Sequence, residues 1–147
     1  MIDLHKLVLS INLGKITKDE AIEQLRKALV YSMRIGDRYV LNMGKLNIDL
    51  RAQFDDPVNF PIDLIFNFDE WRNDDVYKRI VRQVEDVDLM GNKKCYFMNE
   101  TFDIIILRDV TTDTPENDKR EEIKSQIPHF YKSFETMFVT REGSKED

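Results

Sequence analysis

The sequence contains a single cysteine, Cys95, among its 147 residues. One cysteine cannot form an internal disulfide, and such low cysteine usage is typical of proteins from a reducing compartment. The residues around it, Lys94, Tyr96 and Phe97, have the composition of a strand. We therefore expect a packed thiol in an intracellular protein rather than a reactive nucleophile.

Long hydrophobic runs are absent as well. No apolar stretch approaches the roughly 20 residues that a membrane-spanning helix requires. The first residues, from Met1 to Lys6, do not show the basic, apolar and small-residue segments of a secretory signal. These two observations predict a cytoplasmic protein without membrane association.

A surplus of positive charge is also missing. The chain has 22 Lys and Arg against 28 Asp and Glu, which gives a formal net charge of −6 at pH 7. Because phosphate backbones are bound by clustered Lys and Arg, this balance argues against nucleic-acid binding. The acidic residues concentrate between Asp55 and Asp88, where they form either a solvated face or a patch for a basic partner.

The residue patterns of metal and catalytic sites are sparse. His5 and His129 lie far apart, and with one cysteine they cannot supply the ligand set of a structural zinc site. The acidic pairs 69–70 and 74–75 could hold a divalent cation, but they lack the glycine-bearing register of a calcium loop. We therefore assign no catalytic residue, no metal ligand and no cofactor from these patterns.

The strongest positive signal is a helix followed by a strand. Thr17 can cap the helix, and Glu20 three residues later completes a capping box. Gly36 can adopt the left-handed conformation that ends a helix, and a short apolar strand follows at residues 39–42. The helix Lys18–Ile35 has one apolar face, formed by residues at helical spacing: Ala21, Ile22, Leu25, Ala28, Leu29 and Met33.

Weaker patterns predict the remaining elements. The alternating residues Leu46, Ile48 and Leu50 form a short strand, a loop or a helical turn. A continuously apolar run at residues 104–107 is typical of a strand covered on both faces, so we expect it to be central, like strand 39–42. The other predicted elements are a helix over 3–13 or a segment that docks on another surface, a helix over about 75–84, a hairpin of strands 94–98 and 102–107, a helix over 116–126 begun by Thr114 and Pro115, and a strand over 134–139.

Together these elements predict an α/β protein with a mixed sheet flanked by helices. The length of the chain fits one domain with its own core, which we place at residues 1–140. Residues 141–147 are charged and have no apolar anchor, so we expect a flexible tail there.

The order of these pieces resembles a known ATPase module. Residues 28–36 lead through Gly36 into strand 39–42, and the turn Gly91-Asn92 precedes the two strands of the predicted hairpin. This order is similar to the second half of AAA+ type P-loop ATPase modules, and in particular to the motor-ring modules of dynein heavy chains. The resemblance implies a P-loop-ATPase-like fold and, if it holds, a cytoskeletal or ciliary location.

The chemistry of that family is missing from this chain. No Gly-x-x-x-x-Gly-Lys-Ser/Thr loop, which would hold nucleotide phosphates, occurs in the sequence. The resemblance places Asn42 where the family has the acid that helps to hold Mg²⁺, and it places Leu107 or Arg108 at the sensor position. It therefore implies an incomplete ATPase-like fold without hydrolysis. Our first functional hypothesis is a non-catalytic interaction or scaffold domain that acts within a larger assembly.

An alternative hypothesis is a small enzyme or ligand-binding domain with its site in the loop 108–114. This loop follows an apolar strand at its carboxyl end, where ligands bind in open α/β sheets. Arg108 would bind an anionic group, Asp109 would act as a base or metal ligand, and Thr111 and Thr112 would add polar groups. The hypothesis requires a concave pocket with Asp109 partly buried.

A stretch rich in aromatic and acidic residues is the candidate surface for a protein partner. The simpler interpretation, which we favour, is an irregular layer that covers one edge of the core. In the other interpretation the rings are exposed, at least Trp71 or Phe60 among them, and a charged rim attracts a basic partner. The candidate partner-binding residues are Phe60, Phe68, Asp69, Glu70 and Trp71.

Overall fold

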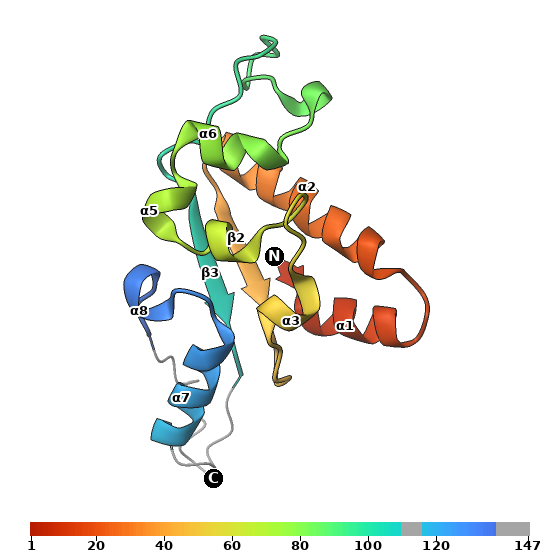
Figure 1. Cartoon of the computed structure of the whole chain (residues 1–147), viewed down its shortest axis with the longest axis vertical. Helices are drawn as coiled ribbons and strands as arrows, with labels where there is room; N and C mark the ends of the chain where they lie inside the picture. Colours follow the sequence, from red (N-terminus) through yellow and green to blue (C-terminus); the bar gives the residue numbers. More distant parts are fainter. Residues whose placement is uncertain (110–115, 138–147) are drawn as a thin grey trace, which may run out of the picture.

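The computed structural model describes residues 1–109 and 116–137 (Figure 1). A small sheet runs through the molecule, and helices pack beside it. None of the described helices has both the length and the apolar composition needed to cross a membrane. In chain order the elements are β1 (Ile2–Asp3), α1 (Leu4–Asn12), α2 (Lys18–Ile35), β2 (Arg38–Asn42), α3 (Leu50–Phe54), α4 (Ile62–Ile65), α5 (Phe68–Trp71), α6 (Asp74–Tyr77), the 3-10 helices η1 (Lys78–Ile80) and η2 (Gln83–Glu85), β3 (Asp103–Leu107), α7 (Glu116–Gln126) and α8 (Phe130–Ser133).

The sheet contains parallel strands in the order β1-β2-β3. Tyr39 of β2 pairs with Ile104 of β3, and Leu41 pairs with Ile106. The predicted α/β class is confirmed. The predicted mixed sheet is wrong for the strands of the described residues, which all pair in parallel. The strand predicted at 104–107 exists, but its predicted central position is wrong because β3 pairs with β2 alone among them.

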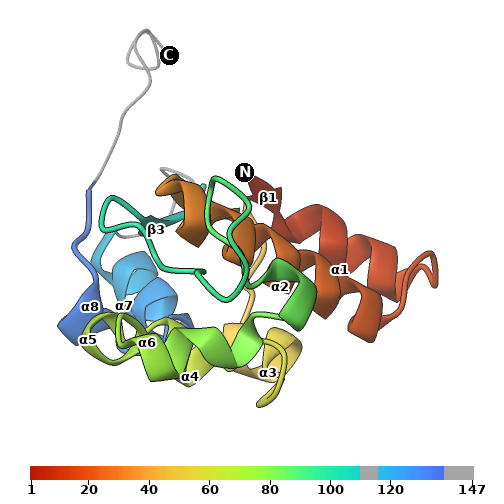
Figure 2. The ribbon, with the colours of Figure 1, turned by 90° about the horizontal axis from the view of Figure 1, so that it is seen from above.

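Within the described residues, one face of this sheet contributes to the core. Crossover connections between parallel strands are right-handed. The connections from β1 to β2 and from β2 to β3 proceed in the same direction across the sheet, so the helices of both connections lie on the same side of it. Tyr39 and Leu41 are buried on that side. On the opposite face Val40 and Ile105 are only half-buried and Leu107 is 41% exposed; we call these three residues the open sheet face. Figure 2 shows α3 to α6 along one side of the molecule, with β1 and β3 toward the other.

The predicted helix α2 is confirmed at both ends. The backbone N–H of Glu20 donates to Thr17 Oγ1 at 3.1 Å, and the backbone N–H of Thr17 donates to Glu20 Oε1 at 3.4 Å. Gly36 ends the helix with φ of 73°, in the left-handed region. The hydroxyl of Thr101 donates to the Gly36 carbonyl at 2.8 Å, so the loop before β3 is tied to the end of α2.

One residue of α2, Arg26, is buried although it is charged. Its guanidinium lies 2.6 Å from a carboxylate oxygen of Glu23 and 2.6 Å from one of Glu85. Its Nη1 also donates to the carbonyl of Ile80 at 2.8 Å. The backbone becomes extended at Val81, with φ of −86° and ψ of 121°, directly after this carbonyl. The predicted continuous helix over about 75–84 is therefore wrong, and α6, η1 and η2 stand in its place.

Residues 94–98 form a loop rather than a strand, so the predicted hairpin is wrong. The Tyr96 hydroxyl donates to the Val30 carbonyl at 2.7 Å, and the Tyr96 N–H donates to Asp86 Oδ1 at 3.1 Å. These contacts with α2 and with the preceding loop replace the hydrogen bonds of a strand pair. Cys95 is exposed in this loop, so the prediction of a packed thiol is also wrong.

The ends of the chain and the segment before α3 show mixed outcomes. The carboxylate of Asp49 accepts the N–H of Ala52 at 3.2 Å and begins α3, so residues 46–50 form a loop and a helix start rather than a strand. The helix predicted over 3–13 is confirmed as α1, but the sequence did not reveal β1 before it. The helix over 116–126 is confirmed as α7. Residues 134–137 contain no strand, while 138–139, the segment 141–147, Thr114 and Pro115 lie outside the described residues.

Candidate functional site

The loop after β3 was the candidate site of the enzyme hypothesis. The Arg108 guanidinium donates from Nη1 to the carbonyls of Gly44 and Asp109, both at 2.9 Å, and from Nη2 to Asn47 Oδ1 at 2.7 Å. These bonds tie the end of β3 to the loop after β2. Arg108 therefore has a structural task, and much of its donor capacity is already used.

Asp109 does not meet the requirement of that hypothesis. Its backbone N–H donates to the Gly44 carbonyl at 2.8 Å, and the residue is exposed rather than partly buried. The expected burial of Asp109 is thus wrong. Thr111 and Thr112 lie outside the described residues.

The two positions implied by the ATPase resemblance lie side by side. Asn42 and Leu107 are register partners at the carboxyl ends of β2 and β3. The Asn42 side-chain oxygen accepts the N–H of Gly44 at 2.9 Å. This neutral amide thus stabilises a turn, and its neighbour on β3 is an aliphatic side chain. Within residues 1–109 and 116–137, no group of three or more His, Cys, Asp and Glu is arranged to hold a metal ion.

The predicted partner-binding residues are divided between the core and the surface. Phe60 and Trp71 are each 1% exposed, so the prediction that at least one of them is partly exposed is wrong. Phe60 is held inward by a pair of backbone hydrogen bonds with Asp56, of 2.8 and 3.1 Å. Phe68 is 45% exposed. Asp69 and Glu70 are also exposed, so these three residues remain on the surface.

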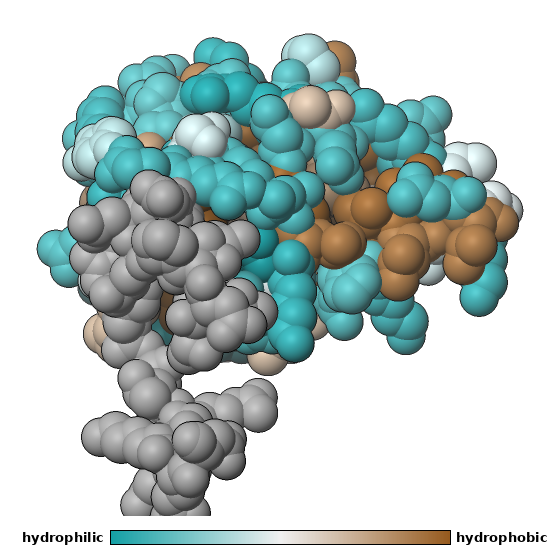
Figure 3. Space-filling model, turned by 90° about the horizontal axis from the view of Figure 1, so that it is seen from below, coloured by the Kyte–Doolittle hydropathy of each residue, from teal (hydrophilic) through white to brown (hydrophobic). Residues whose placement is uncertain are grey.

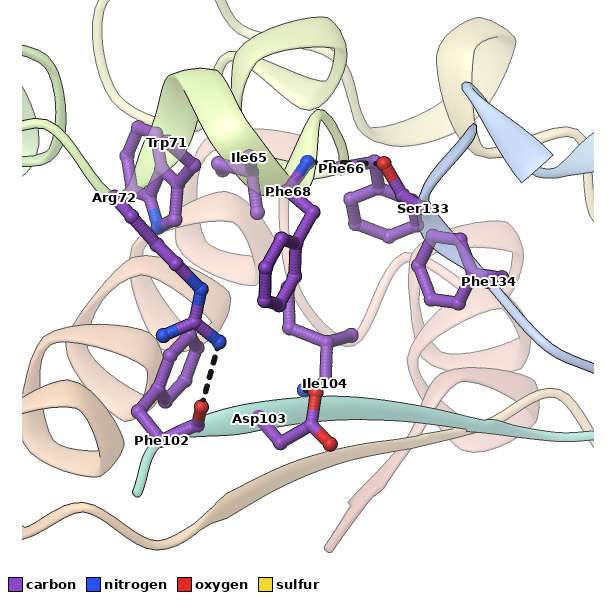
Figure 4. A pocket seen from close by; sticks show the side chains of 10 residues that line it. All are labelled: Ile65, Phe66, Phe68, Trp71, Arg72, Phe102, Asp103, Ile104, Ser133 and Phe134. Atoms are coloured by element: carbon purple, nitrogen blue, oxygen red, sulfur yellow. Dashed lines mark hydrogen bonds between the residues drawn. The ribbon is translucent and has the colours of Figure 1, made fainter. Parts of the chain in front are cut away.

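A pocket lies beneath this surface, between α5, the start of β3 and the end of α8 (Figure 4). It contains about 330 Å³ of empty space, part of which is open to solvent. Its walls are largely aromatic, and one wall is the edge of the core, where the Phe66 and Phe134 rings have centroids 5.7 Å apart. The lining residues are Ile65, Phe66, Phe68, Trp71, Arg72, Phe102, Asp103, Ile104, Ser133 and Phe134.

Arg72 is the cation of this pocket. Its guanidinium carbon lies 4.0 Å from the centroid of the Phe68 ring, a distance typical of a cation–π contact. Its Nη2 donates to the Phe102 carbonyl at 2.8 Å, and its Nη1 makes a long contact of 3.9 Å to the Met98 sulfur. Among the residues that the structure describes, no carboxylate lies within 4.0 Å of it. The charge of Arg72 is therefore not neutralised by an ion pair in this part of the chain.

Two further polar groups line the pocket. The indole nitrogen of Trp71 is buried and has no hydrogen-bond acceptor among the described residues. The hydroxyl oxygen of Ser133 accepts the N–H of Phe68 at 2.9 Å, which leaves its proton free to donate. Sequence reasoning identified Trp71 and Phe68 but not Arg72 or Ser133. The position of Arg72 directly after the aromatic stretch was the only sequence signal for it.

A second feature is the apolar surface of α1. Leu4 and Leu7 of this helix are buried, while Leu9 and Leu13, at its end, are 46% and 69% exposed. Figure 3 shows hydrophobic residues gathered at the end of the molecule where α1 lies. The buried and half-buried residues Leu4, Leu7, Val8 and Ile11 share one face of α1, so Leu9 lies apart from the face that packs on the core. We call Leu9 and Leu13 the α1 surface.

The chain was compared with protein-family models, with curated proteins and with solved structures, and none of the three comparisons gave a match. The resemblance to AAA+ modules accordingly stays a prediction.

Proposed function

We propose that this chain is a non-catalytic interaction domain that binds a protein partner through the α1 surface. The observation that supports this proposal is the exposure of Leu9 in α1 and of Leu13 directly after it, whereas the other apolar residues of the helix are buried or half-buried. Contiguous exposed apolar residues are characteristic of protein–protein interfaces. The alternative sequence interpretation of residues 3–13, a segment that docks on another surface, agrees with this proposal.

The partner is a basic protein. The chain has a formal net charge of −6, and charge complementarity between two proteins accelerates their encounter and suppresses wrong partners. Two exposed acids of α5, Asp69 and Glu70, contribute to this negative field. The apolar contact at α1 supplies the binding energy, while the field orients the approach.

The ATPase-like character of the fold is part of the same proposal. The chain lacks a phosphate-binding loop, and Asn42 replaces the acid that the family uses for Mg²⁺. These features support a fold used for assembly rather than hydrolysis. Isothermal titration with ATP and Mg²⁺ tests this point. We expect no binding, and tight binding with turnover would contradict the proposal.

A site-specific crosslinking experiment tests the interaction surface. A photoreactive amino acid at Leu13 should crosslink a discrete basic protein in cells, while the same group at Val84, which is also highly exposed, should not. The crosslinked protein is then purified and titrated against the chain. The double change Leu9→Glu and Leu13→Glu should weaken the complex by more than about tenfold, which corresponds to roughly 1.4 kcal/mol. Equal binding by this variant and by a Val84→Glu control would contradict the proposed surface.

A further inference from the structure

We propose that the aromatic pocket beside α5 binds a carboxylate carried on a short apolar group. This site is separate from the α1 surface. Two kinds of ligand carry a carboxylate on a short apolar group: a small branched-chain carboxylic acid, and a peptide whose C-terminal residue is apolar. The proposal rests on the walls of the pocket and on two side chains: Arg72, which has no ion-pair partner among the described residues, and Trp71, whose N–H has no acceptor among them.

The walls determine the apolar part of the ligand. Five aromatic rings line the pocket, and they are contributed by segments that lie far apart in the chain: Phe66, Phe68, Trp71, Phe102 and Phe134. An apolar group of modest size gains contact with these rings when it leaves water. The empty space of about 330 Å³ includes open solvent, so the enclosed part of the pocket is smaller than this and excludes a large cofactor.

Arg72 determines the charge of the ligand. A guanidinium has five N–H donors arranged in a fork that matches the two oxygens of a carboxylate. Arg72 uses one strong bond, to the Phe102 carbonyl, and one long contact to sulfur. Figure 4 shows the guanidinium between Phe68 and Phe102, with its bond to the Phe102 carbonyl drawn. Among the described residues its other N–H groups have no acceptor and its charge has no carboxylate partner, so both are available for an anion.

Trp71 provides the independent observation. Its side chain is 1% exposed, and its N–H is unpaired among the described residues. Figure 4 shows the indole nitrogen on the edge of the ring that points toward β3. Buried donors are nearly always paired in folded proteins, so an unpaired one that lines a pocket indicates a missing acceptor. A carboxylate oxygen held by Arg72 would supply it.

The acidic side chain that lines the pocket does not serve as the acceptor for the Trp71 N–H or as the partner of Arg72. Asp103 lines the rim, but its Oδ1 accepts the N–H of Ile104 at 2.8 Å and the residue is exposed. Ser133 also lines the pocket; its hydroxyl oxygen accepts the Phe68 N–H, and among the described residues its own proton has no acceptor. Apart from Asp103 at the rim, the polar side chains of the pocket, Trp71, Arg72 and Ser133, can thus donate, which favours an acceptor over an amine.

The single tryptophan of the chain makes a direct test available. In a ¹⁵N-labelled sample of the whole chain, the only indole N–H signal belongs to Trp71. We would titrate 3-methylbutanoate, N-acetylleucine and, as a neutral control, N-acetylleucinamide. Both acids should shift the indole proton downfield with saturation in the millimolar range, as a new hydrogen bond forms, and the amide should not. The tighter of the two acids identifies the source, a free acid or a peptide terminus.

Variants separate binding from fold maintenance. Arg72→Gln should weaken binding of the acids by about tenfold or more, and Arg72→Lys should retain part of the affinity because it keeps the charge. Arg79→Gln, at an exposed arginine outside the pocket, is the matched control and should bind normally. If Arg72→Gln does not fold, the comparison of acid with amide on the unchanged chain still decides. No indole shift with either acid, or equal shifts with acid and amide, would overturn the proposal.

Discussion

Arg26 and Glu85 lie 59 residues apart in sequence and 2.6 Å apart in space, nitrogen to oxygen. The bond joins the middle of α2 to η2, at the base of the loop that leads to β3. A buried guanidinium that loses one of its carboxylates is left with donors that neither protein nor water satisfies. This relationship leads to two predictions.

Glu85→Ala should destabilise the fold by about 1–3 kcal/mol, because it leaves the buried Arg26 with Glu23 as its one carboxylate partner, beside the Ile80 carbonyl. The free energy of unfolding, measured by urea denaturation, checks this value. Glu121→Ala is a matched control, since Glu121 is exposed and pairs with Lys124 at 3.5 Å. It should cost less than about 1 kcal/mol. Equal costs for the two variants would show that burial does not strengthen the Arg26 pair.

Stability should also fall in acid because of this cluster. The hydrogen bond from Arg26 lowers the pKa of Glu23. Burial alone would raise the pKa of Glu85, but the hydrogen bond from Arg26 leaves it lowered as well. A carboxyl with a lowered folded pKa adds stability that is fully present above its unfolded pKa, ordinarily 4.5. That stability is lost as the pH falls through the folded pKa.

We therefore expect the free energy of unfolding to decrease steadily below the ordinary glutamate pKa of 4.5. Urea denaturation over a series of pH values measures it. Arg26→Met should lower stability at neutral pH and reduce the additional loss in acid, because both carboxyls then lose the hydrogen bond that lowers their pKa. An unchanged acid slope in this variant would assign the pH dependence to other groups.

Two glycines with nearly equal φ allow the cost of backbone strain to be compared with the cost of a steric clash at an added Cβ. Gly14 and Gly36 have φ of 72° and 73°. A Cβ at Gly14 would meet nothing within 4 Å, whereas one at Gly36 would collide with the side chains of Thr101 and Asn99. Gly14→Ala should cost roughly 1–2 kcal/mol from backbone strain alone. Gly36→Ala should cost more, and thermal unfolding of both variants gives the difference. A smaller cost at Gly36 would mean that the loop of residues 99–101 moves away freely.

The exposed thiol gives a chemical prediction. Cys95 is exposed, and its sulfur lies 3.2 Å from the Lys93 carbonyl. A thiol reagent should therefore label one group per chain in the native state at a rate close to that in denaturant. Cys95→Ser should abolish the reaction. Labelling that proceeds only after unfolding would show that the loop around Cys95 is packed in solution.

The sequence predicted the elements whose ends are determined by residues close together in the chain. Thr17, Glu20 and Gly36 determine both ends of α2 by short-range hydrogen bonds and backbone conformation, so its bounds were predictable. The apolar run of β3 was equally clear. The strand β1 was not, because a strand of two residues is defined by its pairing with Leu41 and Asn42 rather than by its own pattern.

Long-range contacts determine the features that the sequence did not reveal. The burial of Arg26 depends on Glu85, and the inward direction of Trp71 depends on packing that no local period encodes. The pocket is assembled from α5, β3 and the end of α8, three segments that only the folded chain brings together. The interpretation of the aromatic stretch as a layer over the core agrees with the burial of Phe60 and Trp71, and only Phe68 departs from it.

The side of β3 that faces away from β2 pairs with no other strand of the described residues, and this bears on aggregation. An edge strand offers free N–H and carbonyl groups to which another chain can add, and proteins commonly block such edges. Here the first two groups are already occupied by side chains of the same molecule. The Phe102 carbonyl accepts from Arg72, and the Ile104 N–H donates to Asp103, each at 2.8 Å. A strand from a second copy would have to displace both bonds before it could begin to pair, so the beginning of this edge resists amyloid-like growth.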